Sequence, residues 1–109
     1  MLAVAAERLR AWPAACLSRL ALNNCGVLHV PWAYLSAAML RHHTPRAVLC
    51  PMVAPGFDAV DMAERLCEAG YGGILLVVAH TPVVDPYLIG REIGRAGADL
   101  FRVEVLPLQ

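Results

Sequence analysis

Lysine is absent from this chain of 109 residues, because all nine of its basic residues are arginine. This absence removes one catalytic, cation-supplying group from every position. Charge is sparse in general: charged residues make up 17% of the chain, and nine basic residues balance nine acidic ones. Since there is no basic excess, we expect no nucleic acid partner.

Cysteine pairs and metal-binding patterns are also missing. The four cysteines form no C-x-x-C pair and have no histidine at zinc-finger spacing. They are Cys16, Cys25, Cys50 and Cys67, and we expect all four to be reduced thiols. The adjacent His42 and His43 point about 100° apart on a helix, so they suit a solvated helix end better than one shared ion. No metal and no cofactor is predicted.

No apolar run approaches the ~20 residues that span a bilayer, so no membrane partner is expected. The first residues, 1–6, begin like a signal sequence. Glu7, Arg8 and Arg10 interrupt this segment before an apolar core has formed, which favours a cytoplasmic location.

Hydrophobic residues dominate what is present, at 59% of the chain. Such a composition is typical of a sheet covered on both faces. The length predicts a single domain over residues 1–109 that can bury a core without disulfides.

Short apolar runs alternate with segments of helical periodicity along the whole chain. The expected strands are residues 2–5, 27–30, 47–50, 73–79 and 101–106, and the expected helices are residues 6–24, 32–43, 58–69 and 85–96. The helix over 32–43 is expected to place Trp32, Leu35, Met39 and His42 on one face. Asp58 and Asp85 are expected to cap the last two helices, and a turn is expected at Pro55-Gly56.

These links are too short for anything but parallel crossovers. The pattern therefore predicts an α/β fold: a doubly wound, five-stranded parallel sheet of flavodoxin-like type, with strand order 2-1-3-4-5 and helices on both faces. A helix after the last strand is not expected, since the chain ends at Gln109.

The middle of the chain resembles one family. The segment Val48-Leu-Cys-Pro-Met-Val-Ala-Pro-Gly-Phe-Asp-Ala59 is similar to the strand-three signature of bacterial response-regulator receiver domains, with its Met-Pro-Gly-x-Asp-Gly turn. Residues 66–79 and 95–99 support the resemblance, which extends over nearly the full chain. It implies a receiver-like fold and a role in two-component signal transduction.

The resemblance also implies a phosphorylation pocket whose chemistry this chain lacks. The acidic metal ligands of the family fall on Ala5 and Ala6, and its phosphate-accepting aspartate falls on Pro51. The family's Thr or Ser after strand four falls on Val78 or Ala79, and its lysine has no counterpart. Phosphoryl transfer to a carboxylate needs a nucleophilic aspartate and a cation held by oxygen ligands. The resemblance therefore implies a pseudo-receiver: a non-enzymatic, phosphorylation-independent module that docks on a protein partner such as a regulator or kinase.

The carboxyl ends of the strands allow two alternative functions, a pocket for a small ligand and an enzyme site. Small side chains there could line a pocket for an apolar ligand; they are Ala5, Ala6, Pro51, Val53, Val78 and His80, beside Cys50. An enzyme would need Cys50 as nucleophile and His80 as base. A buried, inert thiol is the more natural interpretation of Cys50.

The last strand and the helix before it are the predicted interaction surface. The strand lies at a sheet edge and carries apolar residues that we expect to lack full cover: Phe101, Val103, Val105 and Leu106. Gly90 and Gly94 lie one turn apart on the adjoining helix, where another backbone could approach closely; simple helix weakness is the alternative. A homodimer through this surface, or docking of a missing C-terminal segment onto it, is expected.

Overall fold

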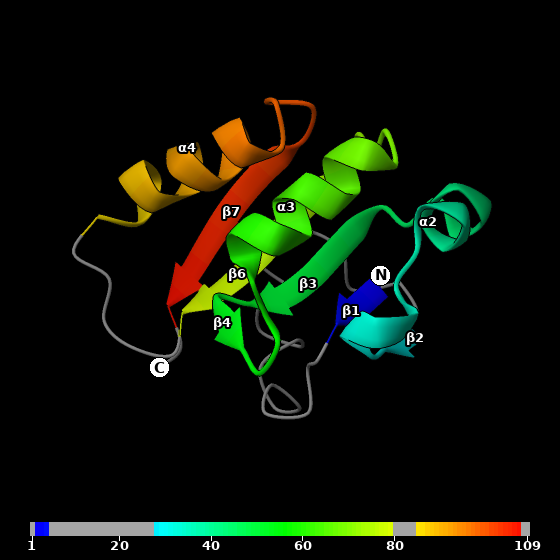
Figure 1. Cartoon of the computed structure of the whole chain (residues 1–109). Helices are drawn as coiled ribbons and strands as arrows, with labels where there is room; N and C mark the ends of the chain where they lie inside the picture. The colour runs from blue at the N-terminus through cyan, green and yellow to red at the C-terminus, as the bar shows by residue number, and fades with distance from the viewer. Residues whose placement is uncertain (1, 5–27, 80–84, 108–109) are drawn as a thin grey trace.

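Five parallel strands form the sheet at the centre of the protein (Figure 1). The computed structural model describes residues 2–4, 28–79 and 85–107. The strands of this sheet are β1 (Leu2–Val4), β2 (Leu28–Val30), β3 (Ala47–Pro51), β6 (Ile74–Ala79) and β7 (Arg102–Pro107), in the spatial order β2-β1-β3-β6-β7. The prediction of an α/β fold with a five-stranded parallel sheet is confirmed, and at this coarse level the fold is flavodoxin-like.

A small hairpin that the sequence did not predict follows β3. It consists of β4 (Val53–Ala54) and β5 (Phe57–Asp58), which pair antiparallel around Pro55 and Gly56. Gly56 has a φ of 89°, in the left-handed region that glycine adopts without strain. The hairpin strands lie outside the sheet but occupy two places in the strand count, so the observed order carries different numbers from the predicted 2-1-3-4-5.

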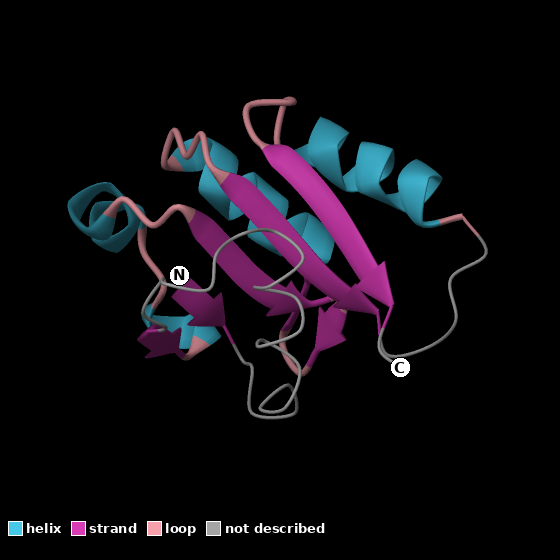
Figure 2. Ribbon diagram, turned by 180° about the vertical axis from the view of Figure 1, so that it is seen from behind, coloured by secondary structure: helices cyan, strands magenta, loops and turns pink. Residues whose placement is uncertain are grey.

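Two helices, α3 (Ala59–Glu68) and α4 (Pro86–Ala96), lie side by side on one face of the sheet, and Figure 2 shows them behind the strands. Both begin at the predicted caps. The Asp58 carboxylate accepts a hydrogen bond from the Asp61 N–H at 2.9 Å, and the Asp85 carboxylate accepts one from the Leu88 N–H at 3.1 Å. The helix predicted for residues 6–24 lies outside the described residues.

The helix predicted for residues 32–43 is divided in two, which corrects the prediction. A 3-10 turn, η2 (Trp32–Tyr34), is followed by α2 (Ala37–His43). The break occurs because Leu35 is extended and the Ser36 hydroxyl caps α2 by accepting a hydrogen bond from the Met39 N–H at 3.1 Å.

The residues predicted to share one face of this segment differ in burial. Leu35 and Leu40 are buried, Trp32 and Met39 are half-buried, and His42 is exposed. Because α2 starts at a new cap, its helical phase is not that of the preceding turn. The exposure of His42 and His43 agrees with the predicted solvated helix end.

The core lies mainly between the sheet and α3. Alternate strand residues, Val48 and Val77 among them, form one buried cluster with Met62 and Leu66 of α3. The predicted inward stripe of α3 is confirmed in full: it consists of Ala59, Met62, Ala63 and Leu66. Among the described helices, none is long and apolar enough to cross a membrane.

Candidate functional site

The carboxyl edge of the sheet, where an α/β protein usually builds its site, is apolar at the described ends of β3 and β6. Pro51 of β3 pairs in register with Val78 of β6, and the Met52 N–H continues this ladder by donating to the Val78 carbonyl at 2.8 Å. Pro51, Val78 and Ala79 are buried and carry no side-chain oxygen. The predicted pocket residues Ala5, Ala6 and His80 lie outside the described residues.

The carboxylates near this edge cap the N-terminus of α3. Asp58 and Asp61 form a capping box: Asp58 accepts from the Asp61 N–H, and Asp61 accepts from the Asp58 N–H at 3.0 Å. Across the residues that the structure describes, no three His, Cys, Asp or Glu side chains gather where they could hold a metal. These aspartates therefore have a structural role.

Cys50 lies fully buried in the core cluster beneath α3. Burial raises the pKa of its thiol far above the ordinary value, and the negative charge of Asp58 raises it further. The thiol is therefore held protonated, and a nucleophilic role for Cys50 has no support. Val53, grouped with Cys50 as a ligand-pocket candidate, is 66% exposed on the hairpin, so the two side chains do not share an enclosed space.

We expect Cys50 to resist alkylation by N-ethylmaleimide in the native protein and to react fully in denaturant, because the reagent needs an exposed thiolate. Peptide mapping by mass spectrometry measures this site by site. Cys67, a half-buried free thiol on α3, is the internal control and should react first. Rapid modification of Cys50 in the folded protein would contradict the structure.

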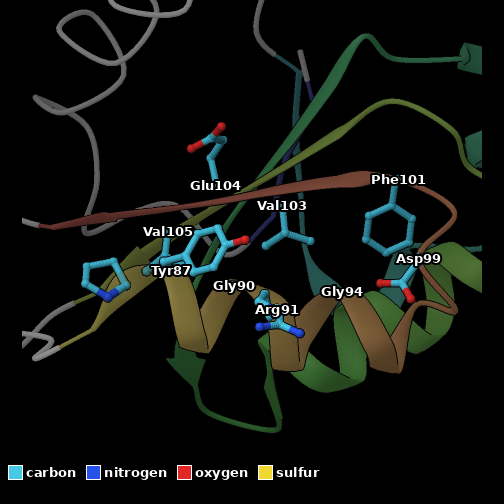
Figure 3. Close-up of a pocket in the computed structure, with 10 residues that line it drawn as sticks. Tyr87, Gly90, Arg91, Gly94, Asp99, Phe101, Val103, Glu104 and Val105 are labelled. Carbon is cyan, nitrogen blue, oxygen red and sulfur yellow. The ribbon is translucent and has the colours of Figure 1, made fainter.

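A groove of about 420 Å³ runs between α4 and β7 (Figure 3). Its floor and walls come from ten residues: Pro86, Tyr87, Gly90, Arg91, Gly94, Asp99, Phe101, Val103, Glu104 and Val105. The volume falls within the range of ~300–1,000 Å³ that is common for ligand pockets. Five of the six predicted interface residues line this groove, and the sixth, Leu106, does not.

Cover over the predicted interface is uneven. Phe101 and Leu106 are buried, at 7% and 6% exposure, whereas Val103 and Val105 are half-buried. The reason is that the Phe101 ring fills the space left by Gly97, since a Cβ at Gly97 would contact that ring. Among residues 102–106 of β7, Val103 and Val105 therefore offer the apolar surface to a partner.

Five lining residues were not among the predicted interface residues: Pro86, Tyr87, Arg91, Asp99 and Glu104. Tyr87 and Arg91 lie one turn apart on α4, with the Arg91 guanidinium 6.0 Å from the centre of the Tyr87 ring. Asp99 follows the helix in a left-handed turn, with φ of 55°. Helical spacing could have identified Tyr87 and Arg91, because positions 87, 90, 91 and 94 share one face of a helix.

A second cavity, of about 320 Å³, lies at the amino ends of β3 and β6. It is lined by Leu40, Arg41, Thr44, Pro45, Ala69, Gly70, Tyr71, Gly72 and Gly73. The Tyr71 hydroxyl accepts a hydrogen bond from the Ile74 N–H and donates one to the Ile74 carbonyl, both at 3.3 Å. Burial raises the pKa of Tyr71 to about 12, so this hydroxyl stays neutral and structural.

Comparisons of the chain with protein-family models, curated proteins and solved structures found no match. Two regions therefore remain as candidates: the apolar described ends of β3 and β6, and the open groove beside β7.

Proposed function

We propose that the protein is a non-enzymatic protein-interaction module of signal transduction, laid out like a receiver domain but independent of phosphorylation. It docks a protein partner through the surface formed by α4 and β7. The observation that carries the proposal is the groove along β7, where an edge strand and half-buried valines are left open.

The carboxyl edge supports the same proposal from the chemical side. Pro51 stands where the resemblance would place the phosphate-accepting aspartate, and Val78 where it would place the hydroxyl residue. Neither side chain has an oxygen that could bind Mg²⁺ or accept a phosphoryl group. Asp58 and Asp61, the nearest carboxylates of α3, already hold backbone N–H groups.

The small-ligand alternative has less support. It needs Cys50 and Val53 to face one enclosed pocket, but Cys50 is fully buried while Val53 is mostly exposed. The groove beside β7 combines apolar residues with charged ones and lies open along a strand edge, which suits a polypeptide better than an apolar metabolite.

The protein is expected to take up no phosphate from acetyl phosphate and to bind Mg²⁺ no tighter than roughly millimolar, because oxygen ligands are missing at Pro51 and Val78. Intact-mass spectrometry detects an added phosphoryl group, and isothermal titration calorimetry measures Mg²⁺ affinity. Stoichiometric, acid-labile phosphate on the protein would contradict the proposal.

Docking of a partner at the α4–β7 surface is tested with two tyrosines of nearly equal exposure. Tyr87 lines the groove at 76% exposure, and Tyr34 lies on η2 at 75%. In cells of the source organism, the amount of protein cross-linked to the chain should fall for Tyr87→Ala but not for Tyr34→Ala. The result should be the same with or without acetyl phosphate. Equal reduction by both variants would remove the case for the α4–β7 surface.

A further inference from the structure

The outer edge of β7 presents unpaired backbone groups to the groove. The Arg102 N–H donates to the Gly73 carbonyl at 3.2 Å, and β7 pairs with β6 in parallel register. Hydrogen-bonding direction alternates along a strand, so the N–H and C=O groups of Val103 and Val105 point away from β6. Within the described residues, no strand pairs with this edge. Among the described residues, these four backbone groups therefore have no strand partner, and an added strand could pair with them.

The α4 wall of the groove contains two glycines, Gly90 and Gly94, that face β7. A Cβ at Gly90 would lie 3.6 Å from Val105 Cγ2 and 3.8 Å from the Val103 carbonyl oxygen, which is ordinary van der Waals contact. A Cβ at Gly94 would lie 3.9 Å from Val103 Cγ2. The two glycines therefore keep open the space beside the two valines, and only small side chains fit between an added strand and α4.

Charged side chains of the groove include Asp99 at one end and Arg91 near its middle (Figure 3). Asp99 Oδ1 lies 3.3 Å from the position of a Cβ at Gly94, so its carboxylate lies across the end where β7 begins. The only ion pair among the described residues joins Arg102 to Glu104, which leaves the Asp99 charge for a cation of the occupant. Tyr87 stands toward the other end of the groove, and Arg91 lies between Tyr87 and Asp99 along α4.

A lone strand fits this groove better than a second copy of the chain. Helix α4 lies close over β7, as the short distance between Gly90 and the Val103 carbonyl shows. If two copies paired their β7 edges antiparallel, strands ~4.8 Å apart would bring both α4 helices to the same place, although packed helices need 8–10 Å between their axes. An extended peptide brings no helix with it.

We propose that the groove binds an extended peptide segment of a partner protein as a sixth, antiparallel strand on β7. Its side chains that face α4 are small, and a lysine or arginine toward its C-terminal end pairs with Asp99. This inference rests on the proposed function and names the class of partner. Backbone hydrogen bonds supply affinity in this mode of recognition, while alternate side chains supply specificity.

The probe for the test is a fluorescein-labelled hexapeptide, Val-Ala-Val-Ala-Val-Lys with a blocked C-terminus, titrated by fluorescence anisotropy into the full chain. In the proposed register the two alanines lie opposite Val105 and Val103, and the lysine reaches Asp99. We expect saturable binding, weakened about tenfold or more when glutamate replaces the lysine.

Backbone methylation of the probe tests the hydrogen bonds directly. An N-methyl group on either alanine removes an N–H that points at β7 and should weaken binding about tenfold or more. An N-methyl group on the middle valine removes an N–H that points away and serves as the matched control. Equal effects at both kinds of position would overturn the strand register.

Two protein variants test the groove. Gly90→Leu should abolish binding because its side chain fills the space beside Val105, while Glu92→Leu, on an exposed part of the same helix, should bind normally. Asp99→Asn keeps a residue that tolerates the left-handed turn and should erase the preference for lysine over glutamate. Circular dichroism confirms that each variant is folded.

Absence of saturable binding up to roughly 1 mM probe would overturn the inference. A concentration-dependent dimer by sedimentation, lost in Gly90→Leu, would assign the groove to a second copy and overturn it as well. The phosphorylation and cross-linking measurements are independent of the probe, so the proposed function stands or falls separately.

Discussion

Replacing Gly73 by alanine is expected to lower the free energy of unfolding by about 2–3 kcal/mol. A Cβ at Gly73 would lie 2.8 Å from the Arg46 carbonyl oxygen and would collide with the Tyr71 hydroxyl end. The Arg46 carbonyl and the Tyr71 hydroxyl are both held by hydrogen bonds to Ile74, so neither can move freely. Gly73 itself is also fixed, because its carbonyl accepts the Arg102 N–H of β7.

The neighbouring glycine is the matched control for this variant. A Cβ at Gly72 would meet nothing within 4 Å, so Gly72→Ala should change stability by no more than roughly 0.5 kcal/mol. Urea denaturation followed by circular dichroism measures both variants. A further variant, Tyr71→Phe, removes the hydroxyl and should reduce the cost of Gly73→Ala. Equal stability of the two alanine variants would show that the strand entrance is looser than described.

Arg65→Met is expected to lower the free energy of unfolding by about 3 kcal/mol. Arg65 Nη1 donates to the carbonyls of Trp32 and Leu35 at 3.2 and 3.1 Å, and its guanidinium lies 3.7 Å over the Trp32 ring. Trp32 in turn stacks on Phe57 at 4.4 Å. One side chain of α3 thus holds the turn after β2 against the hairpin after β3.

Methionine keeps much of the aliphatic packing of arginine but none of its donors, so the loss isolates the polar contacts. Arg65→Lys should recover only part of it, since an ammonium cannot lie flat on the ring while donating in a fork. Arg95→Met, at an exposed position of α4, is the control and should cost no more than roughly 0.5 kcal/mol. A similar loss in both variants would mean that charge alone, rather than the contact with Trp32, is responsible.

The fold was predictable where local chemistry and periodicity agree. Asp58 and Asp85 mark helix starts because a carboxylate can accept an exposed N–H there, and the apolar run at residues 74–79 has the character of a strand buried on both faces. The hairpin β4–β5 was missed since two-residue strands carry no periodic signal. The break at Ser36 was missed because its hydroxyl competes with a helical pattern that continues through it.

The candidate site was predictable only in part. Gly90, Gly94, Val103 and Val105 could be placed on one surface, because edge-strand alternation and helix spacing are local properties. Asp99 could not, since its position at the end of the groove depends on a left-handed turn that no residue type dictates. The contact of Arg65 with Trp32 joins residues far apart in sequence, and no spacing rule predicts such a pair.

The position of β1 in the sheet affects how the protein can fold during its synthesis on the ribosome. β1 lies between β2 and β3, so Leu2 must pair with Leu28 on one side and Val48 on the other. A chain that emerges N-terminus first therefore lacks the second partner of β1 until β3 has left the exit tunnel. Because both pairings close long loops, we expect the apolar side chains of β1 to stay exposed on the nascent chain until then.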